Sequence, residues 1–167
     1  MKINQTKRNS YRESFVYWMF AKVTPLHNKL CGDRNSWNLS PDDFLNYPEG
    51  SLGNELGKFY RSQNFEPISK AERHDVFHVL LGYSTNVIDE GSMQFFLWGN
   101  GKISIFTLGA AVGTAILFPN RFEKYQTAFM RGKQAVNISK WNFKNLLKED
   151  TSKLKSLIFK DNSHEKT

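Results

Sequence analysis

The residues best suited to chemistry lie in residues 72–78 (ERHDVFH), followed after eleven further residues by Glu90. In a helix, His74 and His78 are one turn apart and project from one face, with Asp75 about 100° around the axis. Two imidazoles and nearby carboxylates are the donors that divalent transition metals use in proteins. The spacing therefore predicts a metal site of His74, Asp75, His78 and Glu90, which are also the candidate catalytic residues.

A His-x-x-x-His pair alone is a weak signal, because surface or core histidines explain most such pairs. The nearest motif with a known mechanism is the His-Glu-x-x-His of zinc proteases, in which the glutamate is the general base. Here Asp75 stands at that position, and its side chain is one methylene shorter. A metallohydrolase is therefore a poorer interpretation, because the shorter arm meets a metal-bound water differently.

Local patterns place these residues on two consecutive helices. Ser69 and Glu72 form a capping-box pattern, which predicts a helix that ends at Gly82. This helix is apolar nearly all round, so we expect it to be buried and its charged groups to need partners. A second helix, capped by Ser84 or Thr85 and running to Trp98, places Glu90 in its second turn, with Gln94 one turn further along as a hydrogen-bond partner.

The rest of the chain predicts an all-α fold, a single compact domain of about seven helices over residues 1–167. No stretch alternates strongly enough to indicate a strand. We expect a long loop over residues 27–46. The further helices are expected at residues 10–23, from 52 to 60, 103–118, 121–131 with Gly132 as the stop, 140–148 and 152–160.

Composition limits the classes of partner. The chain has 23 Lys and Arg against 16 Asp and Glu, and the excess is concentrated in residues 120–167, which hold 11 basic and 5 acidic residues. Such a face suits an anionic membrane surface or an acidic protein, although a solvated helix face gives the same pattern. The sequence contains no recognised nucleic-acid module, so no nucleic-acid partner is expected. The single Cys31 excludes an internal disulfide and fits a reducing compartment.

Residues 103–118 form an uncharged run that contains Gly109 and Gly113 at the small-xxx-small spacing. The run is too short for a confident bilayer span. We expect a buried or membrane-facing helix, and the glycine spacing is also compatible with a homodimer through this helix.

The metal motif, with both histidines, Asp75 and the spaced Glu90, is accompanied by residues 48–53 (PEGSLG), 78–82 (HVLLG) and 108–110 (LGA). With these stretches in this order, the chain resembles the coenzyme Q (ubiquinone) biosynthesis protein 4 family. The resemblance spans roughly residues 47–159, so we divide the chain into an N-terminal helix and loop (1–46) and a family-like metal and lipid-binding core (47–160).

This resemblance implies an all-helical protein of quinone biosynthesis, peripheral to the membrane. It implies a metal-dependent, oxidative decarboxylation of a polyprenylated hydroxybenzoate, with other quinone-biosynthesis enzymes as partners. His74, His78 and Glu90 would hold the metal, with Asp75 as fourth ligand or proton-handling neighbour. Zinc is the first choice of cofactor, whereas iron or another transition metal suits an oxidative step better. The alternative is a non-catalytic scaffold that binds prenyl lipids and organises the biosynthetic complex.

A prenylated substrate needs an apolar slot close to the metal. The candidate lipid-binding residues are Phe95, Trp98, Phe106, Gly109 and Gly113. The basic C-terminal helices would hold the protein on an anionic leaflet. The expected location is the cytoplasmic face of a bacterial membrane, or the matrix face of the inner membrane in mitochondria.

Overall fold

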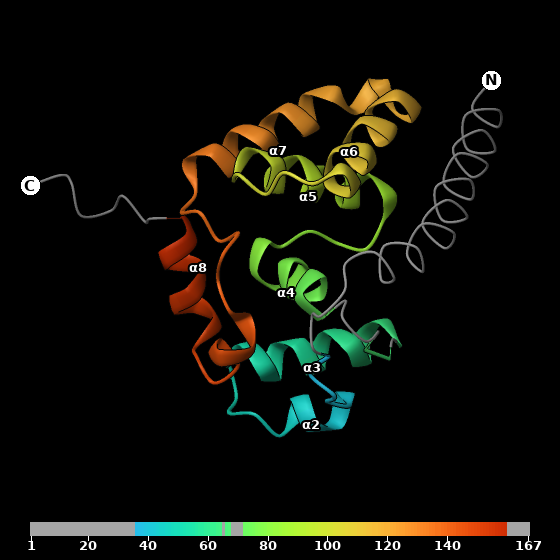
Figure 1. The fold of residues 1–167 in the computed structure, drawn as a ribbon. Helices are drawn as coiled ribbons and strands as arrows, with labels where there is room; N and C mark the ends of the chain where they lie inside the picture. Colours follow the sequence, from blue (N-terminus) through green and yellow to red (C-terminus); the bar gives the residue numbers. More distant parts are fainter. Residues whose placement is uncertain (1–35, 65, 68–71, 160–167) are drawn as a thin grey trace, which may run out of the picture.

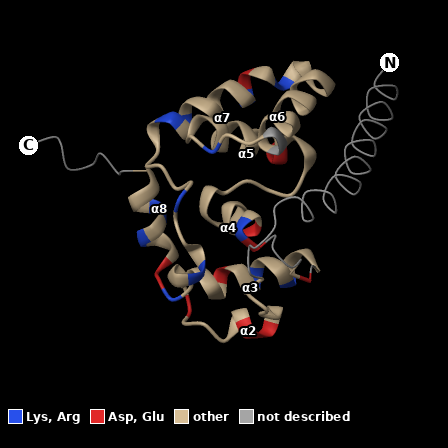
Figure 2. Ribbon diagram, viewed as in Figure 1, with Lys and Arg blue, Asp and Glu red and all other residues tan. Residues whose placement is uncertain are grey.

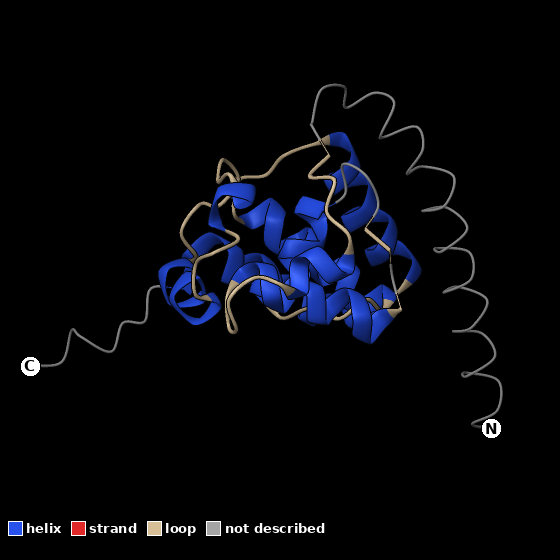
Figure 3. Cartoon of the chain, turned by 90° about the horizontal axis from the view of Figure 1, so that it is seen from below, coloured by secondary structure: helices blue, strands red, loops and turns tan. Residues whose placement is uncertain are grey.

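The computed structural model of the chain describes residues 36–64, 66–67 and 72–159, without the side chains of Ile105 and Phe106. These residues form an all-helical fold with no strand among them, as Figure 3 shows. Ser51 and Asp150 form an isolated antiparallel β-bridge. The predicted all-α fold class is therefore confirmed. The α-helices are α2 (Pro41–Leu45), α3 (Leu52–Gln63), α4 (Glu72–Leu81), α5 (Val87–Gly99), α6 (Ile105–Leu117), α7 (Phe122–Gln134) and α8 (Thr151–Phe159), with short 3₁₀ segments η1 (Pro119–Arg121) and η2 (Phe143–Leu146).

Helix α4 lies in the middle of the molecule (Figure 1). Helices α5, α6 and α7 pack together on one side of it, α3 and α2 lie on the other side, and α8 runs along a third. A continuous core of buried side chains joins these elements; it includes Phe44, Leu52, Leu56, Tyr60, Val76, Phe77, Leu80, Phe96, Tyr125 and Phe143. The two helices that carry the predicted metal ligands are therefore both supported by the core.

Helix α4 closely follows the sequence prediction. It ends at Leu81, and Gly82 adopts a φ of +74°, the left-handed conformation typical of a helix stop. The predicted cap of α5 is wrong in detail, because Asn86, rather than Ser84 or Thr85, accepts a hydrogen bond from the Asp89 backbone N–H. The predicted cap Ser69, the helix at 10–23 and residues 27–35 of the expected loop lie outside the described residues.

Helix α7 continues through Gly132, where the sequence predicted a stop, and ends at Gln134. A Cβ atom at Gly132 would overlap the carbonyl oxygen of Phe96 on α5, and one at Gly99 of α5 would overlap that of Phe129, so these two glycines let the helices approach closely. Gly132 therefore allows α7 to pack closely on α5 and does not end the helix.

Two further predictions are wrong. Within the expected loop, Ser40 and Asp43 form a capping box that begins the short helix α2, with Pro41 at its first position. The expected α-helix over residues 140–148 does not form, and η2 is the only helical segment there. The guanidinium of Arg73 donates hydrogen bonds to three carbonyl oxygens of the segment between α7 and η2, those of Ile138, Ser139 and Trp141. These carbonyls are thereby satisfied without a helix.

Helix α6 has a buried side and an apolar side that faces outward. Thr107, Ala111 and Thr114 are buried, whereas Leu108, Val112 and Ile116 are exposed. The helix carries no charged residue (Figure 2). In the part of the chain that the structure describes, no helix has both the length and the apolar character needed to cross a bilayer.

Candidate metal centre

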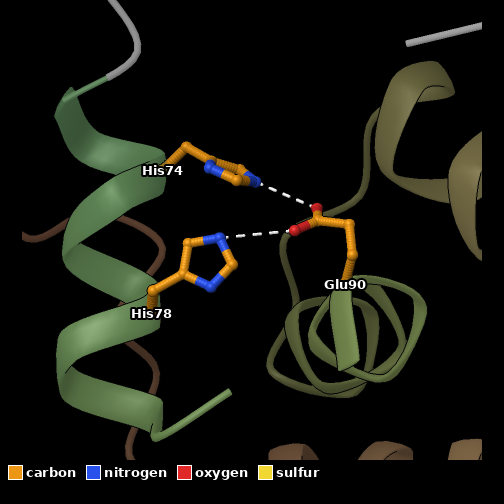
Figure 4. Close-up of side chains that lie close together, drawn as sticks. All are labelled: His74, His78 and Glu90. Atoms are coloured by element: carbon orange, nitrogen blue, oxygen red, sulfur yellow. Dashed lines mark hydrogen bonds and ion pairs between the residues drawn. The ribbon is translucent and has the colours of Figure 1, made fainter. Parts of the chain in front are cut away.

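Three side chains converge between α4 and α5 (Figure 4). His74 Nε2 lies 3.0 Å from Glu90 Oε1, and His78 Nε2 lies 3.3 Å from Glu90 Oε2. One potential ligand atom from each of the three residues lies within 4.8 Å of the other two. The structure therefore brings together three of the four residues that the sequence singled out.

The fourth residue, Asp75, is next to this group but is not one of its members. Its Oδ2 accepts a hydrogen bond of 2.9 Å from the hydroxyl of Tyr60, on α3. Its Oδ1 lies 3.4 Å from His74 Nδ1, on the side of the ring opposite Glu90. In this arrangement Asp75 contacts a histidine of the group and a buried phenol.

The orientation of His78 is fixed by a backbone carbonyl. Its Nδ1 lies 3.0 Å from the carbonyl oxygen of Tyr83, which can only accept, so Nδ1 carries the proton. The ring is also stacked on Phe59, with centroids 5.5 Å apart. In the neutral tautomer, Nε2 then presents a lone pair to a carboxylate oxygen of Glu90, and this contact needs a proton or a cation between the two atoms.

Both ring nitrogens of His74 face carboxylates. Burial disfavours the charged imidazole, but the charge of Glu90 and hydrogen bonds to Asp75 and Glu90 outweigh it and raise the pKa of His74 to about 10. Burial likewise opposes the charged form of Glu90, but His74 and then His78 hold the pKa of that carboxyl well below its usual range. Without a metal, these contacts favour a His74 imidazolium paired with the Glu90 carboxylate.

Two polar neighbours complete the surroundings of the group. Gln94, one turn along α5, donates a hydrogen bond of 2.7 Å to Glu90 Oε1, which confirms the contact expected from the sequence. Burial, and then the charge of Asp75, raise the pKa of Tyr60, so the phenol stays protonated and donates. The sequence indicates Tyr60 only as a core residue. It gives no signal for Tyr83, because the backbone carbonyl, which every residue has, makes the contact with His78.

This donor set fits a divalent metal ion. Two imidazoles and one carboxylate are the protein ligands of many catalytic zinc sites and of non-haem iron sites. A cation among the three would meet the lone pair of His78 Nε2 and the charge of Glu90. It would displace the proton of His74, because a ligating imidazole must be neutral on the ligating nitrogen.

The residues predicted to bind lipid lie in two different environments. Phe95 is buried and stacks on Tyr125 at a centroid distance of 5.2 Å, and Trp98 packs edge-on against Phe129. Gly109 and Gly113 face open space on α6, where an added Cβ would meet no atom within 4 Å. The side chain of Phe106 lies outside the described residues.

Comparison with known proteins identifies one matching family. The family model for "Coenzyme Q (ubiquinone) biosynthesis protein Coq4" matches residues 68–159, a segment that contains the whole of the candidate metal centre except Tyr60. The resemblance seen in the sequence is thereby confirmed for these residues. No curated protein gives a significant match.

A solved structure shares the fold. It is the crystal structure of a protein from Nostoc punctiforme described as a candidate ubiquinone biosynthesis protein, with 14% sequence identity and a TM-score of 0.64. The similarity covers 90% of this chain and 82% of that chain. At this identity the match supports the fold only.

Proposed function

Because this chain belongs to the coenzyme Q (ubiquinone) biosynthesis protein Coq4 family, we propose that it binds one divalent metal ion and uses it to remove the ring carboxylate of a polyprenylated hydroxybenzoate. Family membership implies a part in ubiquinone biosynthesis, together with other components of that process. The single observation that carries the metal proposal is the convergence of His74 Nε2 and His78 Nε2 on the two oxygens of Glu90.

The reaction replaces the carboxylate on a ring carbon by a hydroxyl group. The bond between the ring and the carboxylate breaks, carbon dioxide leaves, and the same carbon gains a C–O bond. This is a two-electron oxidation of the ring carbon, with dioxygen as the proposed oxidant and an external two-electron donor that reduces its second oxygen atom to water. Bound at the centre, the metal would supply positive charge that binds ring oxygens and stabilises the charge developing as carbon dioxide leaves.

The side chains have separate tasks in this proposal. His74, His78 and Glu90 hold the ion, and the Tyr83 carbonyl keeps His78 in the tautomer that leaves Nε2 free. Gln94 holds one oxygen of Glu90 in place. Asp75 lies against His74 Nδ1 and is the neighbouring group that can accept or return a proton. Zinc is the first choice of ion, and iron is the ion that best suits the oxidative step.

We place the prenyl tail on the outward face of α6. Leu108, Val112 and Ile116 form an exposed apolar row beside Gly109 and Gly113, whose missing side chains leave room for an aliphatic chain. Exposed apolar patches of this kind are typical of lipid or protein contacts. Replacing Ile116 by Asn should weaken binding of a fluorescent prenyl phenol, whereas the same change at the exposed Leu157 of α8 should have no effect; equal losses would contradict the placement.

Turnover with purified protein tests the catalytic proposal. We expect metal-loaded protein to release carbon dioxide from a short-chain prenyl hydroxybenzoate in the presence of dioxygen and a reductant. His78→Ala and Glu90→Ala should lose bound metal and turnover, and circular dichroism checks that each variant is folded before it is assayed. Glu55→Ala, at an exposed ion pair with Lys58, is the matched control and should keep both. Unchanged turnover in metal-free protein would refute the proposal.

The outward apolar face of α6 also supports a second function, that of a non-catalytic scaffold that carries quinone intermediates. In that case His78→Ala and Glu90→Ala would still restore quinone production in cells that lack this protein. Under the catalytic proposal they would not. Complementation by these two variants therefore separates the two functions.

A further inference from the structure

We propose that Tyr60 is a positioning residue for the candidate metal centre, because its hydroxyl group holds Asp75 and, through Asp75, the ring of His74. The inference rests on the proposed metal-binding function. It assigns a role to a residue of a different helix, α3, which lies before the segment matched by the family model.

The phenol is held rigidly and is directed at the carboxylate. Tyr60 is only 1% exposed, and its ring packs against Phe44 and Phe59 at centroid distances of 5.5 and 5.9 Å. From this position the hydroxyl donates to Asp75 Oδ2 over 2.9 Å. A ring confined in this way presents its hydroxyl group to Asp75 from a fixed position.

The carboxylate in turn orients the histidine. Asp75 Oδ1 faces His74 Nδ1, so the opposite nitrogen, Nε2, points at Glu90 and at the space between α4 and α5. A carboxylate behind a ligating histidine fixes the orientation and tautomer of the ring and makes it a better ligand. Tyr60 extends this arrangement by one residue, from α3 through Asp75 to His74.

A second buried tyrosine lies outside the centre. Tyr125 is also fully buried, and its ring stacks on Phe95 at a centroid distance of 5.2 Å. Tyr125 also provides a matched control, because Tyr→Phe removes a single oxygen atom at each position.

The experiment measures Zn²⁺ affinity of the metal-free full chain by competition with a chromophoric chelator. We expect Tyr60→Phe to weaken binding by about 10- to 100-fold, the range found when a group that orients a metal ligand is removed. Tyr125→Phe should bind like the wild type. In an Asp75→Ala background, which removes the acceptor of the Tyr60 hydroxyl, the additional effect of Tyr60→Phe should disappear, because Tyr60 acts through Asp75.

Nitrogen-15 NMR of the metal-free chain provides a readout that does not depend on metal. Tyr60→Phe should change the chemical shifts of His74 Nδ1 and Nε2, whereas Tyr125→Phe should leave them unchanged. If Tyr60→Phe does not fold, 3-fluorotyrosine in place of Tyr60 decides, because the fluorinated phenol is a stronger hydrogen-bond donor to Asp75. Altered His74 shifts with altered Zn²⁺ affinity then support the inference, and wild-type values for both overturn it.

The remaining outcomes separate this inference from the proposed function. If the wild type binds no Zn²⁺, both are overturned. If the wild type binds and Tyr60→Phe binds equally well, only the role of Tyr60 is overturned, and the metal site stands. A loss of thermal stability in Tyr60→Phe without any loss of affinity shows a purely structural hydrogen bond and also overturns it.

Discussion

Replacing Glu90 by Gln tests how the metal-free centre is held together. Glutamine has nearly the same shape but no charge, so the change removes the ion pair with His74 and leaves the packing in place. The Glu90 side chain is 13% exposed and lies 3.0 Å from His74 Nε2. An amide at position 90 can still accept from Gln94 and can donate to His78 Nε2, so His74 carries most of the loss.

The size of the loss follows from this one contact. A hydrogen bond between charged groups contributes about 1.5–3 kcal/mol, and we take the lower part of the range because 40% of the His74 side chain is exposed to screening solvent. We therefore expect Glu90→Gln to lower the free energy of unfolding by about 2 kcal/mol at pH 5.5. The corresponding fall in Tm is about 4–8 °C.

The loss should depend on pH in a defined direction. His74 has a raised pKa, so its contribution is fully present below its ordinary value of 6.5 and disappears as the pH rises through about 10. Glu90 has a lowered pKa, so its contribution is present above 4.5 and is lost only as the pH falls well below that value. The difference between wild type and Glu90→Gln is therefore largest between about pH 4.5 and 6.5.

The assay is urea unfolding in EDTA at pH 5.5 and at pH 9.5, followed by circular dichroism. Glu55→Gln is the control, because Glu55 and Lys58 form an exposed pair whose loss should change stability by less than about 0.5 kcal/mol. Equal stability of Glu90→Gln and wild type at pH 5.5 would refute the reasoning. A loss of the same size at both pH values would also refute it.

Two other predictions follow from the same contacts. Binding of Zn²⁺ at pH 7 should release about one proton, because the raised pKa of His74 favours its protonated form in the metal-free centre. Calorimetry in buffers of different ionisation enthalpy measures the number of protons released. A value of zero would contradict the raised pKa of His74. Gly132→Ala should lower the free energy of unfolding by about 1–3 kcal/mol, because the added Cβ meets the Phe96 carbonyl. Gly109→Ala, in open space on α6, should raise the free energy of unfolding by about 0.5–1 kcal/mol. Urea unfolding compares the two variants, and unchanged stability of Gly132→Ala would contradict the close approach of α5 and α7.

The proximity of His74, His78 and Glu90 was predictable from the sequence because the information for it is local. His74 and His78 share one helix face by spacing alone, and Gly82 with its turn delivers Glu90 from the following helix. The contact of Gln94 with Glu90 is a spacing of one turn and was predicted for the same reason.

What the sequence did not reveal depends on contacts between distant parts of the chain. Tyr60 reaches Asp75 from α3, and no periodicity distinguishes it from other core residues of that helix. Gly132 was interpreted as a helix stop because the sequence around a glycine does not distinguish a helix end from a close contact with a neighbouring helix. In the segment after α7, carbonyl oxygens of Ser139 and Trp141 accept hydrogen bonds from Arg73, far away in sequence, and no local pattern indicates this contact.

The central claim is that His74, His78 and Glu90 hold one divalent ion. Anomalous diffraction from crystals grown with Zn²⁺ tests this most directly. We expect one strong peak per chain between α4 and α5, about 2.0–2.2 Å from a nitrogen of each histidine and from an oxygen of Glu90. Crystals in which this position holds no anomalous scatterer, with Glu90 still bridging the two imidazoles at full Zn²⁺ loading, would contradict the account.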